Sequence, residues 1–262
     1  MRVVDGSWYL PGSGRSGLSE YAQGHIPGAV FLDLDEVSET HSSLPHMLPQ
    51  SDEFAAHMSA LGLDEGDDLI VYDGSGTNLS AARIWWMFRV FGHSKVAVLD
   101  GGMGKWQSEG RPLEQGMVHP PPGHFSAGLD QRAVRDLAAM RANLKNPAEQ
   151  VVDLRPAGRF RGEEPEPRPG IRSGHLPGSI NLPFTELVSP DGTILPLGSL
   201  RRRLEVAGID LSQPIVATCG SGTSACTLVL ALELLGHRDT AIYDGAWTEW
   251  GGRADTPVET GP

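Results

Sequence analysis

Cysteine is nearly absent from this 262-residue chain, which has only Cys219 and Cys226. Two cysteines in one short stretch cannot form a disulfide framework, and they do not have the spacing of zinc ligands. So few cysteines fit a reducing compartment, and we expect a cytoplasmic protein. Long apolar runs are absent too: no stretch approaches the roughly 18 apolar residues of a membrane-spanning helix, and the N-terminus has no apolar signal-peptide region.

Basic residues are scarce. Lys and Arg number 21 against 33 Asp and Glu, so the formal net charge is −12. The resulting field repels polyanions, which makes nucleic acid and anionic membrane surfaces unsuitable partners. A small anionic substrate would therefore need arginines placed at its own site.

The second half of the sequence repeats the first. HIPGA at residues 25–29 returns as HLPGS at 175–179, VYDGSGT at 71–77 as ATCGSGT at 217–223, and VLDGGMGKW at 98–106 as IYDGAWTEW at 242–250. Short apolar runs alternate with amphipathic stretches, which is typical of α/β units with a mainly parallel sheet. We expect two similar domains, at residues 1–118 and 128–262, with a proline-rich linker region at 107–130.

Some repeated residues favour a structural role because both halves contain them. His25 and His175 occupy the same turn in each half, so we expect each imidazole to make a hydrogen bond that holds the turn. Trp106, Trp247 and Trp250 recur at the domain ends and are interpreted as core or interface aromatics.

Cys219 lies in TCGSGTSA (residues 218–225), between a strand-like and a helix-like apolar run. In such a loop, converging backbone N–H groups and the positive end of a helix favour a reactive thiolate. The alternative is a tight turn that contains an inert, buried cysteine. The first half has Asp73 at the matching position, so it cannot supply a sulfur nucleophile. Cys226 lies seven residues past Cys219, about two turns into the helix that we expect to follow the loop, and is interpreted as buried packing rather than a resolving thiol.

Together these motifs resemble the tandem rhodanese-type sulfurtransferases over nearly the whole chain. The longest matches are YAQGHIPGAVFL at residues 21–32 and IYDGAWTEW at 242–250. The resemblance implies an α/β fold of two tandem rhodanese-like domains, each a mainly parallel sheet flanked by helices. It also implies that Cys219 is the catalytic nucleophile and that the first domain is catalytically inactive.

Within that family the loop after the cysteine separates two classes of sulfur donor. Thiosulfate sulfurtransferases typically carry basic residues there, whereas the 3-mercaptopyruvate type carries CGSGVTA. The loop here is neutral and is similar to the second type, although Thr223 and Ser224 replace the Val-Thr pair. The loop residues expected to hold anionic sulfur through their amides are Gly220, Gly222, Thr223, Ser224 and Ala225.

The resemblance also implies a substrate clamp in the loop at residues 158–170. Arg159 and Arg168 would hold the carboxylate and keto oxygens of an α-keto acid, and Arg161 is a further candidate in the same loop. Without the resemblance, the same arginines would be interpreted as a solvated loop paired with its own glutamates.

A proton relay is implied as well, formed by Asp35, His46 and Ser221. The carboxylate would orient the imidazole, and the imidazole would polarise the hydroxyl that reaches the reacting sulfur. A lone histidine in a chain with nine of them is more often structural, so this role for His46 depends on the resemblance.

The sequence thus predicts a sulfurtransferase that moves sulfur from 3-mercaptopyruvate, through a persulfide on Cys219, to cyanide or to a thiol such as that of a thioredoxin-like protein. Pyruvate would leave, and no metal or organic cofactor is implied. The alternatives are a thiosulfate sulfurtransferase and a non-catalytic docking module for sulfur-relay proteins. A related phosphatase with a His-Cys-x5-Arg loop is disfavoured because Ala225 stands where that arginine would be.

Overall fold

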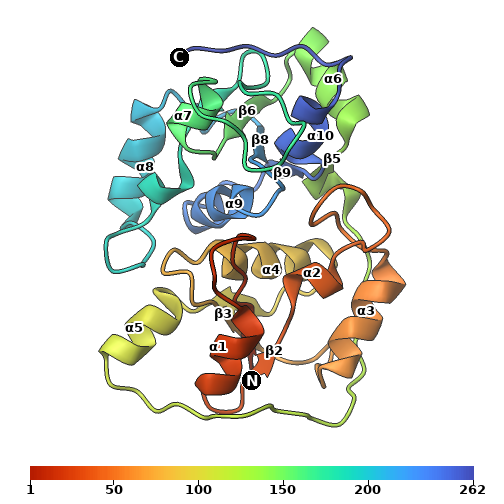
Figure 1. Cartoon of the computed structure of the whole chain (residues 1–262), viewed down its shortest axis with the longest axis vertical. Coiled ribbons are helices and arrows are strands. Elements are labelled where there is room, and N and C mark those ends of the chain that lie inside the picture. The colour runs from red at the N-terminus through yellow and green to blue at the C-terminus, as the bar shows by residue number, and fades with distance from the viewer. The chain divides into compact units, whose positions relative to one another are not determined.

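The computed structural model describes residues 1–262 and divides the chain into two compact units. Unit 1 comprises Met1–His41, Leu48–Asp130 and Ser189–Ile194, and unit 2 comprises Ser42–Met47, Gln131–Val188 and Leu195–Pro262. Each unit is an all-parallel sheet flanked by helices, which confirms the predicted α/β class (Figure 1). Each unit also contains a six-residue arm from the other half of the sequence: Ser42–Met47 lies in unit 2 and Ser189–Ile194 in unit 1.

Unit 1 has a four-stranded sheet in the order β2-β1-β3-β4, with every neighbouring pair parallel. Its strands are β1 (Arg2–Asp5), β2 (Val30–Phe31), β3 (Leu69–Tyr72) and β4 (Val96–Val98). Its helices are α1 (Gly17–Gln23), α2 (Leu34–Val37), α3 (Ser51–Ala60), α4 (Leu79–Val90) and α5 (Gly102–Ser108).

Aromatic side chains join helices α3 and α4 in unit 1. Phe54 stacks on Phe91 with ring centroids 4.3 Å apart and meets Phe88 edge-on at 5.6 Å. The proline-rich segment at residues 109–130 has no helix or strand and is tied to this unit, because the Gly123 amide donates to Ser59 and the Asp130 amide to Val90. The boundary between the two units along this segment falls after residue 130.

Unit 2 has a five-stranded parallel sheet in the order β5-β9-β8-β6-β7. Its strands are β5 (Val134–Arg135), β6 (Gln150–Asp153), β7 (Ile180–Asn181), β8 (Ile215–Thr218) and β9 (Thr240–Tyr243). Its helices are α6 (Leu137–Lys145), α7 (Ala157–Phe160), α8 (Leu197–Val206), α9 (Ala225–Leu234) and α10 (Ala246–Gly252), with short 3₁₀ turns η1 (Gln131–Ala133) and η2 (Phe184–Leu187).

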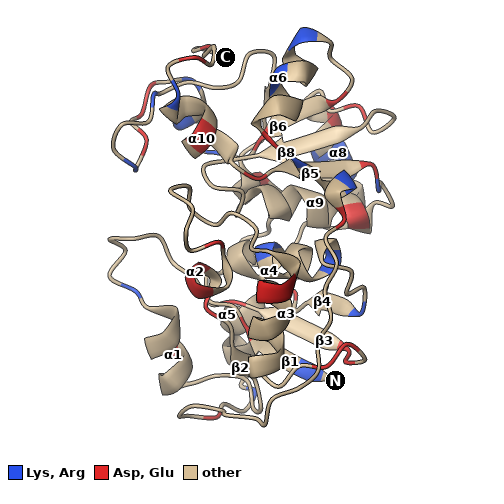
Figure 2. Cartoon of the chain, turned by 90° about the vertical axis from the view of Figure 1, so that its right-hand side faces the viewer, with Lys and Arg blue, Asp and Glu red and all other residues tan.

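The central strands position the two glycine-rich loops. Strands β3 and β8 carry no charged residue and are buried almost throughout, as expected for parallel strands covered on both faces (Figure 2). The carboxyl ends of parallel strands meet at one edge of a sheet, and each glycine-rich loop follows one of these two strands. This edge is where ligand sites of open α/β sheets form.

The repeated histidines have the predicted structural role. The His25 ring stacks on Tyr21 with Nδ1 2.9 Å from the Tyr21 carbonyl oxygen, and the His175 ring stacks on Phe160 with Nδ1 2.9 Å from the Phe160 carbonyl oxygen. Trp247 and Trp250 are fully buried in the core of unit 2, whereas Trp106 is only partly buried in unit 1. No helix in the structure combines the length and apolar character needed to cross a membrane.

Candidate active site

The loop at residues 219–224 links the end of β8 to the start of α9, as the sequence predicts. Its first carbonyl groups are bound by helix α10. The Trp247 amide donates to the Cys219 carbonyl oxygen at 2.9 Å, and the Thr248 amide and hydroxyl donate to the Gly220 carbonyl oxygen at 3.0 and 2.6 Å. These bonds fix the orientation of the peptide planes next to Cys219.

The backbone N–H groups of the loop are unpaired. From Gly220 to Ala225, no backbone N–H has an acceptor within the protein. Gly222 has a φ of 77°, in the left-handed region that glycine adopts without strain, and this curls the loop. The N-terminus of α9 adds its positive end. The Cys219 side chain, only 2% exposed, therefore lies in a loop whose free donors suit an anion.

The matching loop of unit 1 already contains an anion. The Asp73 carboxylate, 1% exposed, accepts hydrogen bonds from the Ser75 and Ala81 amides, both at 2.8 Å. It also accepts from the hydroxyls of Ser75 at 2.6 Å and Ser80 at 3.2 Å. The Ser75 amide corresponds to that of Ser221, which is free in unit 2, and the Gly74 amide, which corresponds to that of Gly220, donates to the Ser7 hydroxyl. This comparison within one chain supports the assignment of residues 219–225 as an anion-binding loop.

Two predicted relay residues meet in unit 2. Nδ1 of His46 lies 2.9 Å from the hydroxyl oxygen of Ser221, and Thr223 places a second hydroxyl oxygen 3.1 Å from the same nitrogen. All three side chains are buried. His46 has a φ of 59°, which is uncommon for a residue with a Cβ and typical of functional positions. The arm Ser42–Met47 thus delivers an imidazole to the cysteine loop.

Arg159 lies against the same loop. A Cβ added at Gly220 would be 3.3 Å from Nη2 of Arg159, so the guanidinium is next to the residue that follows Cys219. Glu166, buried to 4% exposure, binds Nε and Nη2 of Arg159 and also accepts from Nη1 of Arg155 at 2.7 Å. Nη1 of Arg159 has no protein partner and can bind a substrate carboxylate.

A buried ion-pair network holds Arg159 in place. Arg155 is bound in bidentate fashion by Asp153, with Nη2 to Oδ2 at 2.6 Å, and its guanidinium lies over the Trp247 ring, 4.3 Å from the centroid. The carboxylates of Asp153 and Glu166 raise the pKa of Arg155 and outweigh the opposite effect of burial, so this cation stays charged. Glu166, itself held by Arg155, fixes the Nε and Nη2 edge of the Arg159 guanidinium.

The remaining predicted residues differ in their surroundings. Arg161 pairs with Glu163 at the surface, as the solvated-loop interpretation expects. Arg168 is half-buried in the irregular segment after α7, and its place in the clamp stays a prediction. Asp35 belongs to unit 1, where its carboxylate accepts a hydrogen bond from the Trp8 indole at 3.0 Å, and its pairing with His46 also stays a prediction.

Cys226 is fully buried, as expected for a packing residue. Its Sγ lies 3.3 Å from the Gly222 carbonyl oxygen, to which the thiol donates. This contact orients the peptide between Gly222 and Thr223.

The sequence did not identify Arg155 and Thr248 as supporting residues, and it did not show that Glu166 is the glutamate that binds Arg159. Arg155 and Thr248 each follow the carboxyl end of a strand of unit 2 within a few residues, which is the one signal that could have identified them. From the sequence, Glu166 is one of several glutamates that could pair with the loop arginines.

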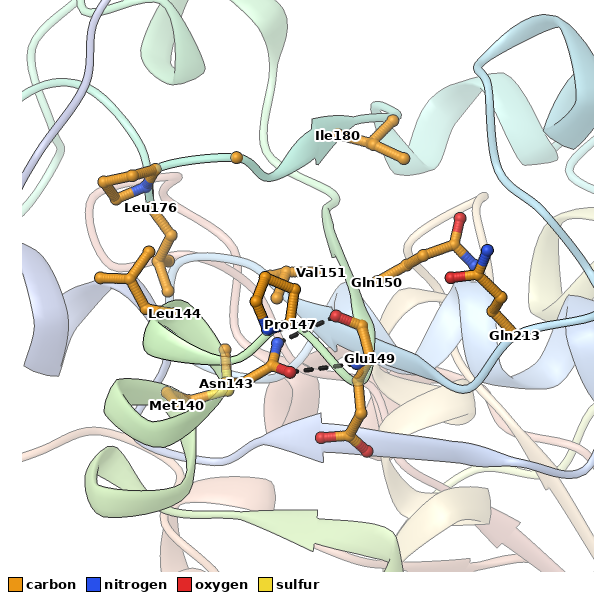
Figure 3. Close-up of a pocket in the computed structure, with 12 residues that line it drawn as sticks. Met140, Asn143, Leu144, Pro147, Glu149, Gln150, Val151, Leu176, Ile180 and Gln213 are labelled. Carbon is orange, nitrogen blue, oxygen red and sulfur yellow. Dashed lines mark hydrogen bonds between the residues drawn. The ribbon is translucent and has the colours of Figure 1, made fainter.

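A cavity of about 220 Å³ lies elsewhere in unit 2, near the amino ends of β6 and β7. Its lining is mainly apolar. Figure 3 shows that the amide of Asn143, its central polar group, already bonds the backbone of Glu149. None of the predicted site residues lines this cavity, so we assign it no part in catalysis. No group of three or more His, Cys, Asp or Glu side chains is arranged to hold a metal ion.

Comparison with known proteins identifies the class of this fold and site. A family model described as a rhodanese-like domain matches residues 17–109 and 136–253. The chain is 43% identical to thiosulfate/3-mercaptopyruvate sulfurtransferase 1 of Arabidopsis thaliana, over 99% of this chain and 74% of that protein. It is 44% identical to human 3-mercaptopyruvate sulfurtransferase, over 97% of this chain and 86% of that protein.

A solved structure agrees with the sequence matches. The crystal structure of SseA from Escherichia coli, described as a 3-mercaptopyruvate sulfotransferase, superposes with a TM-score of 0.86 at 40% identity, over 94% of this chain and 92% of that one. The chain belongs to the rhodanese family and has two tandem rhodanese-like domains. It is an enzyme of the sulfurtransferase class.

Proposed function

We propose that this enzyme transfers sulfur from 3-mercaptopyruvate to a thiol acceptor through a persulfide on Cys219. The observation that carries the proposal is the loop at residues 219–225, whose amides are free and which lies beside the guanidinium of Arg159. The names of the human and Escherichia coli relatives support this choice of donor.

Donor binding depends on arginine. Nη1 of Arg159 is available for the carboxylate of an α-keto acid, because Glu166 occupies only Nε and Nη2. Arg168 completes the clamp on the carboxylate and keto oxygens. Two guanidinium groups can bind these oxygens and stabilise the enolate that forms when the carbon–sulfur bond breaks.

In the first half-reaction, the Cys219 thiolate attacks the sulfur of the donor. A sulfur–sulfur bond forms, the carbon–sulfur bond breaks, and its electron pair passes to carbon as the enolate of pyruvate, which then takes up a proton. The loop amides from Gly220 to Ala225 hold the anionic sulfur before and after transfer.

The proton is handled by Ser221 and His46. The 2.9 Å contact between the Ser221 hydroxyl and Nδ1 of His46 permits a proton to pass between the two groups. Asp35 completes the relay by orienting the imidazole, in the pattern of a carboxylate–imidazole–hydroxyl triad.

In the second half-reaction, an acceptor thiolate attacks the outer sulfur of the persulfide. The new sulfur–sulfur bond forms on the acceptor, the bond to Cys219 breaks, and its electron pair regenerates the Cys219 thiolate. A thioredoxin-like protein or a small thiol provides suitable chemistry, and cyanide can replace it in an assay.

Thiosulfate is the second candidate donor, because the Arabidopsis relative is named for both donors. The neutral loop favours 3-mercaptopyruvate, since no basic residue lies between Cys219 and Ala225 to attract a dianion. We expect kcat/KM to be higher for 3-mercaptopyruvate than for thiosulfate. The opposite order would favour thiosulfate, and full turnover by Cys219→Ser would contradict both candidates.

A further inference from the structure

Two hydroxyl groups compete for one nitrogen in unit 2. Nδ1 of His46 is 2.9 Å from Ser221 Oγ and 3.1 Å from Thr223 Oγ1, and neither hydroxyl has another protein partner. The two residues flank Gly222, whose left-handed backbone curls the chain between them. The proton relay of the proposed function needs only one of these hydroxyls.

A neutral imidazole nitrogen offers one lone pair or one N–H group, so it forms one strong hydrogen bond at a time. When Ser221 turns its hydroxyl toward a reacting sulfur, Nδ1 would lose its bond to that hydroxyl in a site where Ser221 and His46 are nearly inaccessible to water. Thr223 can take over that bond without a change of backbone conformation, because its hydroxyl is already within reach.

His46 needs such a restraint for a second reason. Its φ of 59° lies in a region that is unfavourable for a side chain with a Cβ, and such residues keep that conformation only where neighbouring contacts hold them. A second hydroxyl on the ring holds the imidazole in place throughout the reaction.

We propose that Thr223 is a positioning residue, which holds the His46 imidazole in alternation with Ser221. This inference rests on the proposed function, because it assigns Thr223 a part in the same sulfur transfer. Thr223 contributes its hydroxyl to this role, in addition to the backbone amide that it contributes to the anion-binding loop.

The test is a double-mutant cycle on the full chain, with 3-mercaptopyruvate as donor and cyanide as acceptor. The variants are Ser221→Ala, Thr223→Val and the double variant; valine keeps the shape of threonine and removes only the hydroxyl. Thr227→Val is the matched control, since the Thr227 hydroxyl is buried in α9 without a hydrogen-bond partner. Thr223→Ser is the conservative rescue. Denaturant midpoints establish that each variant is folded.

Each single substitution should lower kcat about three- to tenfold with little change in KM, because the remaining hydroxyl still holds the ring. The double variant should lose more than the product of the two single losses. Thr223→Ser should retain the wild-type rate, and Thr227→Val should do the same. The ¹⁵N signal of His46 Nδ1, assigned with His46→Gln, should shift in Thr223→Val but not in Thr227→Val.

A double variant that loses no more than the product of the single losses would overturn the proposal, as would an unchanged His46 signal in Thr223→Val. Failure of the proposed function is a separate result. If the wild type formed no persulfide, the sulfur-transfer assignment would fail, while the ¹⁵N signal would still report whether Thr223 holds the imidazole.

Discussion

Glu166 provides the sharpest test of the proposed substrate clamp. Its carboxylate is 4% exposed and lies between the guanidinium groups of Arg155 and Arg159. Glu166→Gln removes the negative charge and leaves the size of the side chain nearly unchanged. The amide nitrogen cannot accept a hydrogen bond, so Arg159 loses at least one of its two bonds to this side chain, whereas Arg155 keeps its bidentate bond to Asp153.

The expected magnitudes follow from that geometry. Breaking a buried ion pair costs about 3–5 kcal/mol, and the hydrogen bond that glutamine retains recovers part of this, so the free energy of unfolding should fall by about 2–3 kcal/mol. Arg159 also loses its fixed orientation. A charge-assisted hydrogen bond to the donor carboxylate contributes about 1.5–3 kcal/mol, so kcat/KM for 3-mercaptopyruvate should fall roughly 10- to 100-fold, mainly through KM.

The same substitution in the same loop gives the control. Glu163 pairs with Arg161 at the surface, where both side chains are exposed, so Glu163→Gln should change neither stability nor kcat/KM. The assays are urea unfolding and initial rates of pyruvate release across a range of donor concentrations. An unchanged KM in Glu166→Gln, or equal effects of the two substitutions, would refute the argument that Glu166 positions Arg159.

Three further predictions concern the two glycine-rich loops. Asp73→Ala removes the buried acceptor of four hydrogen bonds, so the free energy of unfolding measured in urea should fall by about 3 kcal/mol. The folded protein should keep its turnover, and a loss of turnover in folded protein would show that Asp73 takes part in catalysis. Because Gly222 and Gly208 both have positive φ, replacing either with alanine should lower the free energy of unfolding by about 1 kcal/mol. Only Gly222→Ala should also lower kcat, and equal kcat values in the two variants would contradict the proposed role of the cysteine loop. Cys226→Ala should still form the persulfide at Cys219 when treated with donor. If mass spectrometry detected no persulfide in this variant, Cys226 would take part in the sulfur transfer.

The sequence predicts the strands and loops whose residues follow a regular apolar pattern. The apolar runs that became β3 and β8, and the glycine-rich loops after them, are local features that hydrophobic alternation and turn composition report directly. The role of Cys219 and its proximity to Arg159 required the family resemblance, because no period connects the two segments.

No local sequence pattern predicts the exchange of arms. Residues 42–47 and 189–194 are short irregular segments, so they carry no periodic signal that assigns them to one sheet or the other. The contact between His46 and Ser221 was predicted from the resemblance alone. The second hydroxyl of Thr223 appeared only in the structure, because side-chain hydrogen bonds depend on geometry that composition does not encode.

The sequence also does not show which glutamate of the loop pairs with Arg159, because this choice depends on side-chain geometry. Glu163, Glu164 and Glu166 are equivalent on the basis of charge and spacing, yet only Glu166 is buried beside Arg155 and Arg159. The expectation of a cytoplasmic location rests on the low cysteine content and on the absence of long apolar runs, and it stays a prediction.

The central claim is that Cys219 carries the transferred sulfur, and intact-mass analysis tests it most directly. The protein is treated with 3-mercaptopyruvate without an acceptor, and the modified residue is located by peptide mapping. We predict one added sulfur atom on Cys219, its loss on addition of cyanide, and no addition to Cys219→Ser. Sulfur on another residue, or pyruvate release with no sulfur added to the protein, would contradict the account.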